Sequence, residues 1–105
     1  MTLGEWVDAR DPAPPAALAD ALRAELGADL DLELSAAPGA FLRAGERVMQ
    51  RVLQAEPQTP AVAPDLLLAD ALVTYAFEAV AESASGADQL ALDAMARLGA
   101  LGDAR

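Results

Sequence analysis

Hydrophobic residues recur at intervals of three and four along most of the chain, the spacing that places side chains on one face of an α-helix. Residues 15–26 follow this pattern, and Gly27 is a natural stop after them. Residues 39–56 follow it too, with an apolar stripe on one side and three arginines, spaced four apart, on the other. The stripe contains Leu42, Val48 or Met49, Val52 and Leu53, and the arginines are Arg43, Arg47 and Arg51.

The N-terminus predicts a shorter helix, from about Leu3 to Ala9. Thr2 and Glu5 have the spacing of a capping box, in which each side chain bonds the other residue's backbone N–H. The prolines that follow would end this helix, so residues 1–14 are expected to form a short helix and a linker. Three more prolines predict a loop at 57–64.

The most apolar stretch is LLLADALVTYAFEAVAE, residues 66–82, whose strongly polar members before the last are Asp70, Thr74 and Glu78. It predicts a helix that runs to about Ser83 and ends in the segment SASG. A last amphipathic helix is then expected from Asp88 to Leu101. Its inward-facing side chains would include Leu92 and Met95.

Residues 28–35 fit two patterns. Leu30, Leu32 and Leu34 alternate with acidic residues, which is the period of a strand, yet Leu26, Leu30 and Leu34 also fit a helical period of four. We favour an extended or irregular segment at 29–34, because acidic residues are poor strand formers. A strand there would find no partner elsewhere in the chain and would need another protomer or protein.

These patterns predict one all-α domain over residues 1–105, a small bundle of about four helices around a central apolar helix at 66–83. The length suits a single domain. The composition agrees, since 54% of the chain is hydrophobic but only 4% is aromatic, and alanine and leucine are strong helix formers.

A helix that is apolar on nearly every side has two explanations. Either the amphipathic helices cover it, or a leftover face meets a second copy or another protein. We expect an interface, because a small domain has little surface with which to wrap a central helix. A homodimer is the commonest closed solution. The candidate interface residues are Trp6, Leu66, Leu68, Leu72, Tyr75, Phe77 and Val80.

The charge narrows the range of partners and locations. With 17 acidic and 7 basic residues the formal net charge is −10, which disfavours nucleic acids and anionic membranes. The run at 66–81 is too short to span a membrane, and the N-terminus has no apolar signal segment. We therefore expect a soluble, cytoplasmic protein with neither nucleic-acid nor membrane partners.

The charges are also distributed in blocks. Residues 25–33 carry four acids and no base, whereas residues 43–51 carry three arginines and one acid. The two blocks could pair within the fold or across an interface, or both could be solvated faces, where exposed ion pairs contribute only about 0–1 kcal/mol.

Little catalytic chemistry is available to the chain. Without histidine, cysteine or lysine it cannot form Ser–His, Cys–His or Ser–Lys pairs, and no phosphate-binding glycine loop is present. No cofactor is expected. The acidic residues Asp70, Glu78 and Glu82 are weak candidates for Mg²⁺ or Mn²⁺ ligands. Residues 66–82 resemble one helix of all-α polyprenyl diphosphate synthases, but the family's DDxxD motifs have no counterpart, so the resemblance implies no synthase activity.

The leading hypothesis is a non-enzymatic protein–protein interaction or assembly module that associates with itself through an apolar helical face. One alternative is a carboxylate- and Mg²⁺-dependent helical hydrolase. The other is a carrier that holds a small apolar ligand near Tyr75 and Phe77.

Overall fold

The computed structural model describes the backbone of residues 1–103, with side chains for residues 1–84 and for Leu92, Met95 and Ala96. Within these residues the chain is helical and contains no strand, which confirms the predicted all-α class with about four helices. None of the described helices is both long and apolar enough to cross a membrane. The α-helices are α1 (Leu3–Asp8), α2 (Ala16–Leu26), α3 (Ala37–Gln54) and α4 (Val62–Asp103), and the 3₁₀ helices are η1 (Gly27–Asp31) and η2 (Leu34–Ala36).

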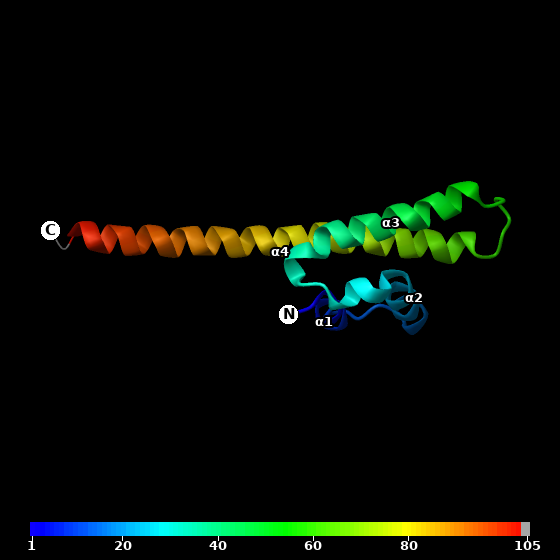
Figure 1. Ribbon diagram of the computed structural model, residues 1–105, viewed down its shortest axis with the longest axis horizontal. Coiled ribbons are helices and arrows are strands. Elements are labelled where there is room, and N and C mark those ends of the chain that lie inside the picture. The colour runs from blue at the N-terminus through cyan, green and yellow to red at the C-terminus, as the bar shows by residue number, and fades with distance from the viewer. Residues whose placement is uncertain (104–105) are drawn as a thin grey trace.

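An antiparallel hairpin of α3 and α4 organises the molecule. Figure 1 shows α1 and α2 together on one side of this hairpin, and it shows the C-terminal half of α4 extending past every other helix. The molecule is therefore elongated, with principal extents of 72 × 23 × 23 Å.

Helix α4 is a single element of 42 residues, so the predicted break at SASG and the separate last helix are wrong. Gly86 costs only about 1 kcal/mol in a helix interior, and the alanines and leucines around it favour the helix. The helix also begins at Val62, inside the predicted loop at 57–64. Pro64 then lies in the first turn, where backbone N–H groups have no helical acceptor in any case.

The ends of α1 and α2 follow the local sequence signals. The Glu5 N–H donates to Thr2 Oγ1 and the Thr2 N–H donates to Glu5 Oε1, both at 3.2 Å, which confirms the capping box. The bond from the Thr2 backbone N–H, and then the Thr2 side chain, lower the pKa of Glu5. Helix α2 ends at Gly27, whose φ of 51° is a conformation that favours glycine.

The ambiguous segment 28–35 is neither a strand nor a continuous helix. Two 3₁₀ helices flank the extended residues Leu32 and Glu33, which lie beside the N-terminus. The Leu3 N–H donates to the Leu32 carbonyl at 2.8 Å, and Thr2 forms a single antiparallel bridge with Glu33. The segment is thus irregular, as favoured from the sequence, and no strand forms that would need another chain. The N-terminus supplies backbone partners to its extended residues.

Three aromatic rings form the centre of the core. Trp6 of α1, Phe41 of α3 and Tyr75 of α4 lie with ring centroids 5.4 to 5.9 Å apart, in tilted and edge-on pairs. Further along the hairpin the backbones approach closely at Gly45, where a Cβ would lie 3.3 Å from Val73. Around these contacts the large buried side chains are Leu3, Val7, Leu22, Leu26, Val48, Leu68 and Leu72.

An ion-pair cluster joins α2 to α3. The carboxylate of Glu25 lies 2.5 Å from Arg51 and 3.6 Å from Arg47, and Arg51 also lies 3.5 Å from Asp65 of α4. One acid of the 25–33 block thus pairs with the arginine block inside the fold. The cluster fixes which side of α3 faces α2.

Helix α4 is not the covered central helix that the sequence predicts. Leu68 and Leu72 are buried, but Leu66, Leu67, Phe77 and Val80 are 45%, 64%, 69% and 50% exposed. The other helices cover α4 along one side only. Leu92 and Met95, which were expected to face inward, are 60% and 67% exposed, because their part of α4 extends beyond the other helices.

Candidate interaction surface

Six exposed apolar side chains lie on the α3–α4 hairpin, on the side away from α1 and α2. The three on α3 are 36% to 78% exposed, and the three on α4 are 45% to 69% exposed. Large apolar side chains left in water at neighbouring positions are typical of a binding surface. We call this set the outer face; it consists of Leu42, Met49 and Leu53 of α3 and Leu66, Phe77 and Val80 of α4.

Contacts on the opposite side place the α3 residues on the outer face. Arg47 and Arg51 both reach Glu25 of α2. Met49 lies two residues from each arginine, about 200° around the helix, and so points away from α2. Leu42 and Leu53 share the side of Met49, at spacings of seven and four residues.

The same reasoning places the α4 residues. Glu78 and Glu82 both reach Arg10 of α1. Val80 lies midway between them in sequence and so points away from α1, and Phe77 lies one turn before it. Val73, which is partly buried, belongs to the same row of α4 and also contacts Gly45 of α3, so the outer face is continuous across both helices.

The structure places three of the seven predicted interface residues on the outer face and the other four in or against the core. Leu66, Phe77 and Val80 lie on the outer face. Tyr75 is partly buried, with its ring against Trp6 and Phe41, and burial raises the pKa of its hydroxyl, as does the nearby Glu78 carboxylate. The core of the chain itself covers the other three, which are Trp6, Leu68 and Leu72.

Sequence reasoning missed the α3 half of the outer face. The sequence pattern placed Leu42, Met49 and Leu53 in a single apolar stripe that also held Val48 and Val52. In the structure each of the three follows directly after a residue of a second row that is more buried. That inner row consists of Phe41, Val48 and Val52. The sequence did hold a signal, because two adjacent rows share the same seven- and four-residue spacing. A helix that packs one face against one neighbouring helix cannot bury both rows.

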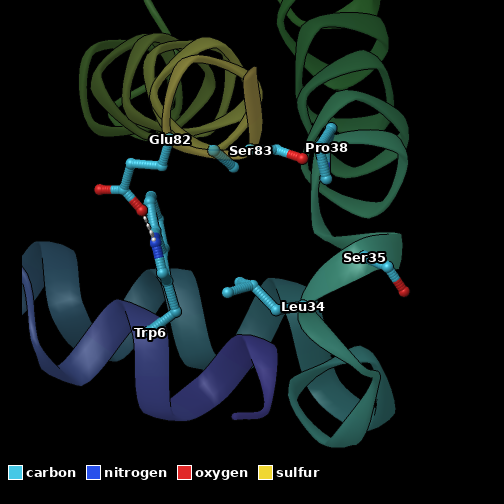
Figure 2. Close-up of a pocket in the computed structure, with 7 residues that line it drawn as sticks. Trp6, Leu34, Ser35, Pro38, Glu82 and Ser83 are labelled. Carbon is cyan, nitrogen blue, oxygen red and sulfur yellow. Dashed lines mark hydrogen bonds between the residues drawn. The ribbon is translucent and has the colours of Figure 1, made fainter. Parts of the chain in front are cut away.

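A pocket of about 310 Å³ opens where α4 leaves the rest of the molecule. Figure 2 shows the Trp6 ring rising from α1 toward Glu82 of α4, with Leu34 beside the ring and the Ser35 hydroxyl turned away. The residues that line the pocket are Trp6, Leu34, Ser35, Pro38, Ala79, Glu82 and Ser83.

Trp6, Arg10 and Glu82 join α1 to α4 at the edge of this pocket. Trp6 Nε1 donates to Glu82 Oε2 at 2.6 Å, and Arg10 Nη1 donates to Glu82 Oε1 at 3.0 Å. The Arg10 guanidinium also lies 3.5 Å from the centre of the Trp6 ring, within cation–π distance. The bond from Trp6, and then the bond from Arg10, lower the pKa of Glu82.

The carboxylates proposed as metal ligands are engaged elsewhere or lie apart. Glu82 is held by Trp6 and Arg10, Glu78 lies 3.7 Å from Arg10, and Asp70 is exposed. Within the described residues no group of three acidic side chains could hold a metal ion. The pocket beside Trp6 is lined by neither Tyr75 nor Phe77, so it is not the site proposed for a carrier.

The role of Glu82 predicts a dependence of stability on pH. Its folded-state pKa is below the ordinary value of 4.5, so the carboxylate stabilises the fold above that value. The stabilisation is lost as the pH falls through the lower, folded-state pKa. Glu82→Gln should therefore be less stable than the natural chain near neutrality, and the two should converge in acid.

Denaturant unfolding followed by the fluorescence of Trp6, the single tryptophan, would measure both proteins across this range. The other carboxylates are present in both proteins, so the difference between the proteins reports on Glu82. A difference that stays constant with pH would show that the charge of Glu82 contributes nothing.

Two features therefore remain for function, the outer face and the Trp6 pocket. Comparisons of the chain with models of protein families, with curated proteins and with solved structures found no match.

Proposed function

We propose that the chain is a non-enzymatic interaction module that associates with itself through the outer face. The observation that supports this is the exposure of large apolar side chains along one side of the hairpin, with Leu53 and Phe77 78% and 69% exposed. Burying a leucine or phenylalanine side chain stabilises by about 1.5–3 kcal/mol, so covering the outer face would drive association. We further propose a cytoplasmic location, which agrees with the finding that no described helix could span a membrane.

The two enzymatic or carrier alternatives have weaker support. A metal-dependent hydrolase needs convergent carboxylates, whereas Glu78 and Glu82 neutralise Arg10. A carrier needs an enclosed apolar cavity, whereas Phe77 lies on the exterior.

The test is the mass in solution, measured by light scattering behind a sizing column over a range of concentrations. The natural chain should form a dimer or larger species, and Phe77→Asp should shift it to monomer because a carboxylate would replace a central apolar contact. Leu67→Asp is the matched control. Leu67 is 64% exposed on the same helix but lies outside the outer face, so this variant should associate like the natural chain.

Two results would contradict the proposal. One is a natural chain that stays monomeric at every concentration. The other is a Phe77→Asp variant that associates as strongly as the natural chain, which would place the contact on another surface.

A further inference from the structure

The α4 part of the outer face belongs to a longer apolar seam. Leu66, Val73, Phe77 and Val80 are spaced by seven, four and three residues, as are the a and d positions of a heptad. Helix α4 continues without interruption to Asp103. In the same register Asp70 is the one charged residue, and the positions from 84 to 101 hold only alanine and leucine. The a positions are Asp70, Phe77, Ala84, Ala91 and Leu98, and the d positions are Leu66, Val73, Val80, Ala87, Ala94 and Leu101.

The two halves of α4 match in length. Residues 62–83 belong to the part that lies along α3, and residues 84–103 extend past the other described helices (Figure 1). At 1.5 Å per residue these halves measure about 33 Å and about 30 Å. The extended half is thus long enough to cover the outer face from end to end, but a continuous helix cannot fold back onto its own first half.

We propose that residues 84–103 of a second copy cover the outer face, with the two α4 helices antiparallel and a two-fold axis near residue 82. This inference rests on the proposed self-association and names its partner segment. Each copy then both supplies a covering helix and receives one, which closes the assembly at two subunits.

Side-chain size supports this register. In an antiparallel pair the a positions of one helix lie opposite the d positions of the other. With the axis near residue 82, Phe77 lies opposite the partner's Ala87, Val73 opposite the partner's Ala91, and Val80 opposite the partner's Ala84. Phe77, Val73 and Val80 each meet an alanine, whereas Leu66 meets the partner's Leu98 near the end of the pairing. The alternation of large and small side chains around the axis lets two helices pack closely.

The rest of the molecule is compatible with this pairing. Helices α1 and α2 lie on the other side of the hairpin, so they do not obstruct a helix laid on the outer face. The α3 row, Leu42, Met49 and Leu53, would border the covering helix along its length. Antiparallel helices also place opposite dipole ends together, which is favourable.

The chain has no cysteine, so single cysteines can report the pairing directly. We would mix Val73→Cys with Ala91→Cys under mild oxidation. The proposal expects disulfides between the two different variants, because residues 73 and 91 lie opposite each other. Val73→Cys alone should not cross-link: the two copies of residue 73 would be about 27 Å apart, far beyond the roughly 7 Å limit between the Cα atoms of a disulfide.

A second pair of variants tests the seam without cysteines. Ala91→Asp, which places a carboxylate at an a position, should raise the dissociation constant about 100-fold or more, since the symmetric dimer would bury two such charges. Gln89→Asp adds the same charge on the same helix outside the seam, and should change the dissociation constant by about twofold at most.

The outcomes separate this inference from the function on which it rests. Cross-linking of Val73→Cys with itself would indicate parallel helices and overturn the antiparallel pairing. A dimer that forms no 73–91 disulfide and tolerates Ala91→Asp would overturn the role of residues 84–103 while leaving self-association intact. A natural chain that is monomeric throughout would reject the proposed function itself.

Discussion

Replacing Leu72 with aspartate should abolish the folded state. Leu72 is fully buried on α4 beside Gly45 of α3, and its Cβ would lie 3.6 Å from a Cβ at position 45. No basic side chain is among the described core residues to pair with a carboxylate there. An unpaired buried charge costs several kcal/mol or more, against a total stability of about 5–15 kcal/mol for a domain of ordinary stability.

Far-UV circular dichroism and urea unfolding would measure this loss. Leu67→Asp, the same change at a position 64% exposed, should alter the free energy of unfolding by no more than about 0.5 kcal/mol. A Leu72→Asp variant with natural helicity and a cooperative transition would contradict the placement of α4 against α3. Because the position is buried, this substitution tests folding, whereas Phe77→Asp tests assembly.

Replacing Phe41 with alanine should cost about 3–5 kcal/mol of unfolding free energy, the second largest effect that we expect. Phe41 is fully buried, and its ring centroid lies 5.4 Å from that of Trp6 and 5.9 Å from that of Tyr75. Removal of this ring takes one member from the aromatic cluster and leaves a cavity between α1, α3 and α4.

Urea unfolding followed by Trp6 fluorescence would measure the change, since Trp6 borders the cavity. Phe41→Leu is the control, because it keeps most of the apolar volume and should lose much less stability than the alanine variant. Equal losses in the two variants would mean that the size of the side chain at position 41 does not matter, contrary to the packing described here.

The two proposals and these stability predictions concern different sides of the same hairpin. Core positions lie between α3 and α4 or face α1 and α2, and substitutions there should unfold the chain whatever its oligomeric state. Outer-face positions should change the association and leave the helical content of each chain nearly unchanged. This separation lets a loss of assembly be told apart from a loss of fold.

Local signals in the sequence determined the helical class and several helix ends. The three- and four-residue spacing identified α2 and α3, the Thr2–Glu5 pair identified the start of α1, and Gly27 marked the end of α2. These predictions succeeded because capping and periodicity depend on residues within one or two turns of each other.

The continuity of α4 and its exposed side depended on the tertiary structure. A glycine and two serines near residue 85 are weak breakers, and the sequence alone did not reveal that the helix would run through them. Nor did it say which of the apolar residues at 66–82 would be buried. That choice depends on where α3 and α1 pack, through Gly45, the aromatic cluster and Glu82, and these contacts join residues far apart in the chain.

The sequence by itself therefore determined that the chain would form amphipathic and strongly apolar helices. Only the packing of α1, α2 and α3 along one side of α4 decided which residues became core and which became the outer face. The physical reason is that burial depends on neighbours brought together by folding, whereas helix formation depends mostly on neighbours in sequence.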